Sequence, residues 1–261
     1  MRTELVSEPG DRARPNEDFA GVALPASGRG GAVVVLDGVT PPQGGTGCVH
    51  SVPWFTARLG GALTELTVSR LNMPLAEALS LAIARTAAAH ADTCDLSHPR
   101  TPQATVALAR WQDDAVEHLV LCDSALLLEA PDGTVTPVLD DRLARQPRSA
   151  LATEALVDAE LRNKEGGFFT AAADPSVAAR AVTGSTPRSE VRALAALTDG
   201  ATRWVETFHA GDWADCLAVI RKEGARSLVD RVRDLELADT RRQFLRRSKT
   251  HDDATVAYAE L

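Results

Sequence analysis

The stretch Ala32-Val33-Val34-Val35-Leu36-Asp37-Gly38 decides the fold, because a short apolar run ends there on an acidic residue and a glycine. A valine-rich run of this length is typical of a buried β-strand. The same pattern recurs in Leu119-Val120-Leu121-Cys122, which precedes Asp123, and in Leu194-Ala195-Ala196-Leu197-Thr198, which precedes Asp199. These runs predict acidic side chains at the points where strands end.

Two more acidic pairs stand before strands. Glu17-Asp18 precedes the apolar run 19–24, and Asp252-Asp253 precedes the run 254–258. In an antiparallel sheet the end of one strand lies beside the start of its neighbour, so all these acids can share one sheet edge. Gathered carboxylates repel one another unless a cation neutralises them. Because the ligands are oxygens alone, we expect a hard divalent ion such as Mg²⁺ or Mn²⁺, which indicates a metal-dependent hydrolase.

The composition excludes several classes of protein. The chain has 261 residues, of which 44% are hydrophobic and 25% are charged, as is ordinary for a globular protein. Its net charge of −8 argues against a nucleic-acid partner, which would require a basic face. No signal-like segment follows Met1, and no apolar stretch is long enough to span a membrane. We therefore expect a cytoplasmic protein without a membrane partner.

The cysteines give no sign of a disulfide framework. Cys48, Cys94, Cys122 and Cys216 are widely scattered and form no Cys-x-x-Cys pair, so we expect reduced thiols. Cys94 and His98 have a loose metal-ligand spacing, but the sequence shows no second pair of ligands for them. We therefore expect no metal at these two residues.

The rest of the chain predicts an α+β pattern of antiparallel strands and helical pairs. The first expected elements are a hairpin over 17–37 with strands 19–24 and 32–36, then helices over about 51–71 and 74–91. They are followed by strands over 104–109, 115–121 and 125–129, mostly helical residues over 140–182, a strand that ends at Asp199, helical residues over 204–247 and a last strand from Ala254. Ser51 is the expected N-cap of the first helix, with Pro53 in its first turn. No linker separates two cores, so we predict a single domain over residues 1–261.

Short motifs carry a family resemblance, in order along nearly the whole chain. They are Arg14-Pro15-Asn16-Glu17-Asp18, Val35-Leu36-Asp37-Gly38, Gln103-Ala104-Thr105-Val106, Cys122-Asp123-Ser124, Leu197-Thr198-Asp199-Gly200 and Asp252-Asp253-Ala254-Thr255-Val256. Each motif is weak alone, but the ordered set resembles the type 2C, or PPM-type, metal-dependent serine/threonine protein phosphatases. The resemblance implies a four-layer α-β-β-α sandwich of two packed antiparallel sheets flanked by helical pairs. It also implies hydrolysis of phosphoserine or phosphothreonine by direct attack of a metal-bridging hydroxide.

The resemblance further implies which residues hold Mn²⁺ or Mg²⁺, as two ions with a weaker third. These residues stand at strand ends, and they are Asp37, Gly38, Asp199, Asp252, Glu17 and Asp123. Asp37 would bridge both ions, and the Gly38 carbonyl would bind the first. Asp199 and Asp252 would bind the second ion, Glu17 would act through a water molecule on the metal, and Asp123 would support the third ion together with Asp199.

Two catalytic residues are predicted beside the metals. Arg14 or Arg12 would bind the phosphoryl oxygens, and we choose Arg14, although the family's arginine usually stands one position further from Glu-Asp, where this chain has Ala13. The chain also lacks the histidine that follows Asp-Gly in many members. We hypothesise that His50 replaces it as general acid, because the dipole of the following helix would lower its pKa. The alternative is that His50 only caps that helix.

Three functions stay open from the sequence. The first is a phosphatase that acts on phosphorylated proteins, and the second is a pseudophosphatase that serves as a regulatory binding module. The third is the same metal chemistry applied to a small phosphoester. A variable, flap-like helical segment over about 140–190 would select the substrate.

Overall fold

In the part of the chain that the structure describes, two antiparallel sheets of five strands each form the centre of the molecule. The computed structural model describes residues 1–41, 44–245 and 249–261. The first sheet has, in spatial order, β1 (Arg2–Glu8), β10 (Ala254–Glu260), β9 (Ala193–Leu197), β6 (Ala125–Glu129) and β7 (Val135–Leu139). The second has β2 (Phe19–Ala23), β3 (Gly31–Gly38), β4 (Ala104–Trp111), β5 (Ala115–Leu121) and β8 (Val182–Pro187).

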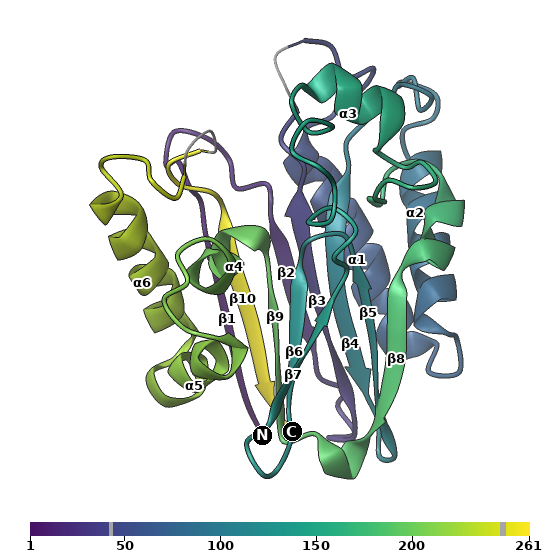
Figure 1. The fold of residues 1–261 in the computed structure, drawn as a ribbon. Helices are drawn as coiled ribbons and strands as arrows, with labels where there is room; N and C mark the ends of the chain where they lie inside the picture. The colour runs from purple at the N-terminus through teal and green to yellow at the C-terminus, as the bar shows by residue number, and fades with distance from the viewer. Residues whose placement is uncertain (42–43, 246–248) are drawn as a thin grey trace.

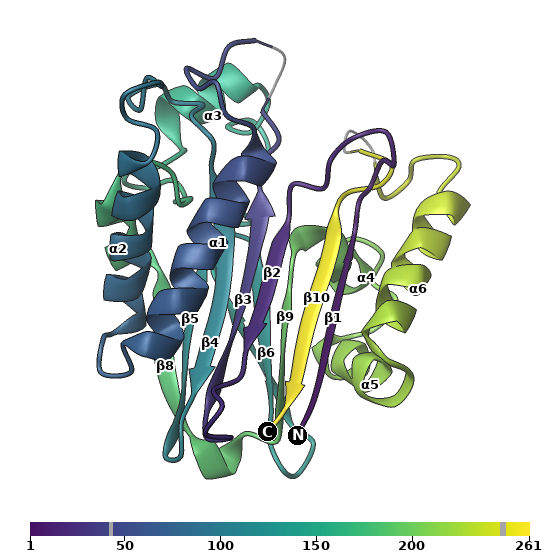
Figure 2. The same cartoon turned by 180° about the vertical axis from the view of Figure 1, so that it is seen from behind.

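Helices cover the outer face of each sheet, which gives the predicted four-layer α-β-β-α sandwich (Figures 1 and 2). The second sheet is covered by α1 (Val52–Ser69) and α2 (Leu75–Ala88), and the first by α4 (Asp199–Glu206), α5 (Trp213–Glu223) and α6 (Ala225–Ala238). Between β7 and β9 lie α3 (Glu154–Glu160) and the 3₁₀ helices η1 (Pro175–Arg180) and η2 (Arg188–Glu190). None of the described helices is long and apolar enough to cross a membrane.

Burial on both faces explains why the central strands are continuous apolar runs. In β3, Val33 and Val35 pack between the two sheets, whereas Val34 and Leu36 pack under the helices α1 and α2. A strand with only one buried face would alternate apolar and polar residues, but a strand covered on both sides cannot. The same reasoning applies to β9, which contacts the other sheet on one face and the helices α4, α5 and α6 on the other.

The strand register brings the acidic strand ends together. Phe19 at the start of β2 pairs with Leu36 near the end of β3, and Val256 near the start of β10 pairs with Leu197 at the end of β9. The residues 122–124 connect β5 in the second sheet to β6 in the first. Residues that precede β2 and β10 therefore lie beside residues that follow β3 and β9, as the sequence predicts.

Most predicted elements are confirmed, with clear exceptions. Ser51 is the N-cap of α1 and Pro53 lies in its first turn. The prediction of mostly helical residues over 140–182 is wrong, because only α3 and η1 form there. The helical prediction over 204–247 extends too far: α6 ends at Ala238, and residues 246 and 247 lie outside the described part of the chain. The strands β1, β7 and β8 were not predicted, and all three are edge strands with partly exposed residues.

Two adjacent glycines of α1 allow a matched test of how this helix packs on the second sheet. A Cβ atom added at Gly60 would lie 2.2 Å from Cδ1 of Phe19, whereas a Cβ at the exposed Gly61 would meet nothing within 4 Å. We expect Gly61→Ala to raise the free energy of unfolding by about 0.5–1 kcal/mol, because alanine stabilises a helix interior relative to glycine. Gly60→Ala should lower it by about 1–3 kcal/mol through overpacking.

Urea unfolding of both variants and of the unaltered protein measures the difference. If Gly60→Ala proved as stable as Gly61→Ala, the close contact between α1 and Phe19 of β2 would be refuted.

Candidate functional site

Carboxylates from both sheets line one cavity at the end of the sandwich. Asp37 is the second-to-last residue of β3, and Asp123 lies in the connection between β5 and β6. Asp199 begins α4 shortly after β9, and Asp252 stands two residues before β10. All four line a cavity of about 310 Å³, together with Gly38. The structure therefore brings together five of the six residues that the family resemblance assigned to metal ions, and the sixth, Glu17, lies in the adjoining cleft.

Two glycines permit this convergence. A Cβ atom at Gly38 would lie 2.4 Å from the backbone oxygen of Glu17, and one at Gly200 would lie 2.0 Å from that of Asp253. Both distances are too short for any side chain, so only glycine lets the chain segments that precede β2 and β10 approach the ends of β3 and β9. The Asp-Gly pairs of the sequence thus have a steric cause.

Burial and mutual repulsion raise the pKa of several of these carboxyl groups. The pKa of Asp37 lies well above its ordinary value, first because of desolvation and then because Asp199 and other acids are near. Desolvation, Asp123 and Asp252 raise the pKa of Asp199 to about 7, although Arg203 opposes the shift. Desolvation also raises the pKa of Asp123. Groups of this kind hold protons that a divalent cation would replace.

Asp18 belongs to the same cluster, although no role was predicted for it from the sequence. Thr198 donates a hydrogen bond to its Oδ2 atom (3.0 Å), but its buried Oδ1 atom has no hydrogen-bond partner among the described residues. Desolvation above all, with the charges of Asp253 and Asp199, raises its pKa to about 8. The pairing of β2 with β3 could have indicated its position. Because Phe19 pairs with Leu36, Asp18 just before Phe19 lies opposite Asp37 just after Leu36.

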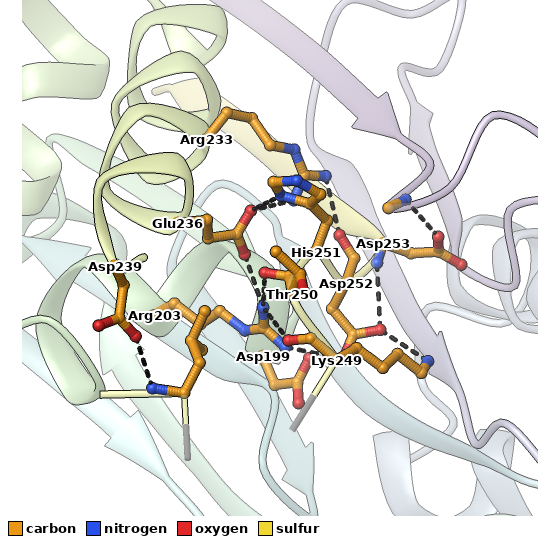
Figure 3. Close-up of polar contacts among 12 residues, drawn as sticks. Asp199, Arg203, Arg233, Glu236, Asp239, Lys249, Thr250, His251, Asp252 and Asp253 are labelled. Atoms are coloured by element: carbon orange, nitrogen blue, oxygen red, sulfur yellow. Dashed lines mark hydrogen bonds and ion pairs between the residues drawn. The ribbon is translucent and has the colours of Figure 1, made fainter. Parts of the chain in front are cut away.

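Asp252 is held in the cavity by two cationic side chains (Figure 3). Arg203 of α4 donates to its Oδ2 atom (3.0 Å), and Lys249 donates to its Oδ1 atom (2.8 Å). The neighbouring Asp253 serves a different purpose, since it accepts hydrogen bonds from the backbone amides of Glu17 (2.6 Å) and Gly10 (2.8 Å). Asp252 therefore faces the cavity, while Asp253 fixes the segment that carries Glu17.

A buried ion network supports this arrangement from α6. Glu236, which is 2% exposed, accepts hydrogen bonds from Arg203 (2.6 Å) and Arg233 (2.9 Å), and its Oε2 atom lies 2.6 Å from Nδ1 of His251. Arg233 also donates to the backbone oxygen of Asp252 (2.8 Å). The two arginines thus bind Asp252, in the segment before β10, through both its side chain and its backbone. None of these supporting residues was predicted from the sequence.

Glu17 and Arg14 lie in a wider cleft that adjoins the cavity. This cleft has a volume of about 680 Å³ and also contains Thr40, Lys249 and Asp252. The Thr40 hydroxyl donates a hydrogen bond to Glu17, and Lys249 donates to Thr40 (2.7 Å). Desolvation raises the pKa of Glu17 despite these contacts. Arg14 is exposed and lines this cleft.

His50 does not line the carboxylate cavity but a smaller pocket of about 220 Å³ beside it, which it shares with Glu17. Its Nδ1 atom lies 3.4 Å from Sγ of Cys94. The alternative that His50 caps α1 is wrong, because the Ser51 hydroxyl accepts the hydrogen bond from the Trp54 amide (3.3 Å) and acts as the N-cap. A role for His50 as general acid stays a prediction.

Cys122 shows why a glycine is favoured before Asp123. Its φ angle of 67° lies in the left-handed region, which residues other than glycine rarely adopt. The side chain is 2% exposed and packs with Val157, Leu161 and Phe168. The apolar contact with the segment around α3 offsets the backbone strain, and Cys122 packs as a small buried hydrophobic residue.

Comparison with known proteins agrees with this geometry. The family described as Protein phosphatase 2C matches residues 11–234, whereas no curated protein matches the sequence. The serine/threonine phosphatase Stp1 from Staphylococcus aureus is 13% identical with a TM-score of 0.60, covering 99% of this chain and 94% of that one. The Mycobacterium tuberculosis serine/threonine phosphatase PstP/Ppp is 18% identical with a TM-score of 0.60, covering 100% and 98%.

A structure of the PstP catalytic domain in complex with 2 manganese ions is also similar, at 18% identity, a TM-score of 0.57, and coverage of 99% and 97%. At these identities the structural likeness establishes the fold.

The raised pKa of Asp199 predicts how the stability of the metal-free protein depends on pH. Because its pKa is about 7 in the folded state and 3.8 ordinarily, the folded protein holds a proton that the unfolded chain releases. Stability should therefore fall as pH rises from about 4 to about 8 in EDTA. Asp199→Asn should make the stability depend less on pH. Near pH 8 its free energy of unfolding should exceed that of the native protein by at least about 1 kcal/mol, the equivalent of one pKa unit.

Denaturant unfolding across this pH range measures the effect. Asp230→Asn, which removes an exposed acid of α6, is the matched control. Parallel profiles for the native protein and Asp199→Asn would contradict the electrostatic interpretation.

Proposed function

Because the chain belongs to the protein phosphatase 2C family, we propose that it is a metal-dependent phosphatase that hydrolyses phosphoserine and phosphothreonine in proteins. The observation that carries the proposal is the cluster of carboxylates from both sheets around one cavity, several of them with a raised pKa. The buried Oδ1 atom of Asp18, which has no hydrogen-bond partner among the described residues, adds an acceptor that requires a cation or a proton.

The cavity fits Mn²⁺ or Mg²⁺ because its donors are oxygens. The residues that would hold two ions and a weaker third are Asp37, the Gly38 carbonyl, Asp199, Asp252, Glu17 and Asp123. Asp18 would add to this set or orient it. When bound, the ions would supply positive charge to the phosphoryl group and make water a nucleophile near neutral pH.

The chain's own residues would position the ligands and the substrate. Arg203 and Lys249 fix the direction of the Asp252 carboxylate, and Thr40 does the same for Glu17. The ammonium group of Lys249 is also partly exposed, so it can offset charge on a phosphoryl oxygen. Arg14 would bind two phosphoryl oxygens through its guanidinium fork.

The segment between β7 and β9 is proposed to select the substrate. Its residues Leu143, Leu151, Val157 and Phe168 form an apolar wall of the carboxylate cavity. A side chain that carries a phosphate would have to pass this wall, and a small phosphoester would contact less of it. The proposed substrate-selecting segment covers residues of about 140–190. We also propose that the chain forms a single domain and that the protein is cytoplasmic.

Phosphatase assays with and without metal test the proposed function. We expect hydrolysis of p-nitrophenyl phosphate and of a phosphothreonine peptide with Mn²⁺ or Mg²⁺ but none in EDTA. Asp199→Asn should lower kcat/KM by more than about 100-fold, because the loss of an outer-shell partner of a metal already costs 10–100-fold. Asp230→Asn serves as the control. Equal turnover by Asp199→Asn and the native protein would refute this metal site.

Arg14 and Arg12 form a second matched pair of variants. If Arg14 binds the phosphoryl group, Arg14→Ala should lower kcat/KM for the peptide by about 10- to 100-fold, since a hydrogen bond to a charged group contributes about 1.5–3 kcal/mol. Arg12→Ala should change it by less than about 2-fold, as expected of an exposed surface charge. The reverse order of the two effects would reassign the phosphate-binding arginine to Arg12.

A further inference from the structure

A second cluster of metal-binding side chains lies apart from the carboxylates. Cys48 and His50 stand in the loop before α1, and His90 and Cys94 stand in the turn after α2. One ligand atom from each residue can be chosen so that all four lie within 4.8 Å of one another. The two pairs are far apart in sequence, and the packing of α1 against α2 brings them together.

The distances within this cluster suit a tetrahedral zinc site. Zinc bonds of about 2.3 Å to sulfur and about 2.0–2.1 Å to nitrogen place the ligand atoms about 3.3–3.8 Å apart. The Nδ1 atom of His50 lies 3.4 Å from Sγ of Cys94 and 3.7 Å from Sγ of Cys48, and Nδ1 of His90 lies 3.4 Å from Sγ of Cys48. The two sulfurs are 3.0 Å apart, so they would separate slightly around an ion.

The surroundings also suit thiolate ligands. The backbone amide of Val49 donates to Sγ of Cys94 (3.4 Å), and that of His50 donates to Sγ of Cys48 (3.4 Å). Hydrogen bonds of this kind stabilise negative charge on sulfur. Trp54 stacks on His50 with ring centroids 4.0 Å apart, which fixes the imidazole plane.

His90 is difficult to explain as an ordinary core residue. It is 2% exposed, its Nδ1 atom faces Cys48, and its Nε2 atom has no hydrogen-bond partner among the described residues. A buried polar side chain with so little hydrogen bonding is costly unless another interaction offsets the desolvation. A bond from Nδ1 to a metal ion would provide that interaction.

We propose that Cys48, His50, His90 and Cys94 bind a structural zinc ion. Two thiolates and two imidazoles select zinc over Mn²⁺ or Mg²⁺, so this site and the carboxylate cavity would hold different metals. Four protein ligands leave no open position, which is the arrangement of a structural site. Under this proposal His50 is a zinc ligand, which would replace its predicted role as general acid.

The proposed site would revise the expectation that Cys94 binds no metal. In the sequence, Cys94 and His98 have a loose metal-ligand spacing without a second pair of ligands. In the structure His90 takes the place of His98, and the second pair is Cys48 with His50. His98 instead accepts a hydrogen bond from the Arg100 amide (3.1 Å) through its Nδ1 atom.

Metal analysis of purified protein tests the proposal. Protein prepared with a reductant and passed over a chelating resin should retain about one zinc ion per chain, as a closed site predicts. Asp199→Asn should retain the same amount, because it alters only the carboxylate cavity. Cys94→Ser and His90→Gln should lose the zinc, whereas His98→Gln and Cys216→Ser should keep it.

Cobalt provides a readout that does not depend on the folding of variants. Co²⁺ added to zinc-depleted native protein should give the visible bands of tetrahedral coordination and a thiolate charge-transfer band, and zinc should displace it. Absence of zinc from the purified protein together with absence of these bands would overturn the proposal. So would a Cys48–Cys94 disulfide found by mass spectrometry in protein prepared under reducing conditions.

Discussion

Electrostatic repulsion among the carboxylates at one end of the sandwich is the constraint on which the rest of the structure depends. Two like charges about 4 Å apart cost roughly 4 kcal/mol at an effective dielectric constant near 20. The chain tolerates its neighbouring carboxylates because raised pKa values favour the protonated form of some of them, and because Arg203 and Lys249 pair with Asp252. A cation bound among them would remove the same repulsion, so the fold is prepared for a ligand that neutralises it.

The two buried sheets hold these acids close together against that repulsion. Strands such as β3 pack on both faces, which leaves their ends little freedom to separate. The buried Glu236 then ties α4 and α6 to the segment before β10 through two arginines. Loss of one partner from such a network leaves an uncompensated buried charge, so the network restricts the segment that carries Asp252 to one position.

The sequence predicts those parts of the molecule that leave a recognisable pattern within a short stretch of residues. The central strands were predictable because burial on both faces leaves continuous apolar runs, and the Asp-Gly pairs marked their ends. The edge strand β7 could not be predicted, since it is short, only partly buried and contains Pro137. Asp18 required the register of β2 against β3, and the support from Glu236 required the position of α6. Both depend on contacts between distant parts of the chain.

The proposed zinc ligands Cys48, His50, His90 and Cys94 show most clearly that contacts between distant parts of the chain could not be predicted from the sequence. Neither Cys48 with His50 nor His90 with Cys94 is a metal site alone, and only the packing of α1 on α2 makes the quartet. The quartet also bears on the carboxylate cavity, because Cys48 and His50 lie in the same β3–α1 connection as Thr40, which binds Glu17. A loop of this kind loses much conformational entropy on ordering. A zinc ion at its far end would offset part of that loss, so the soft metal site would help to hold a ligand of the hard one in place.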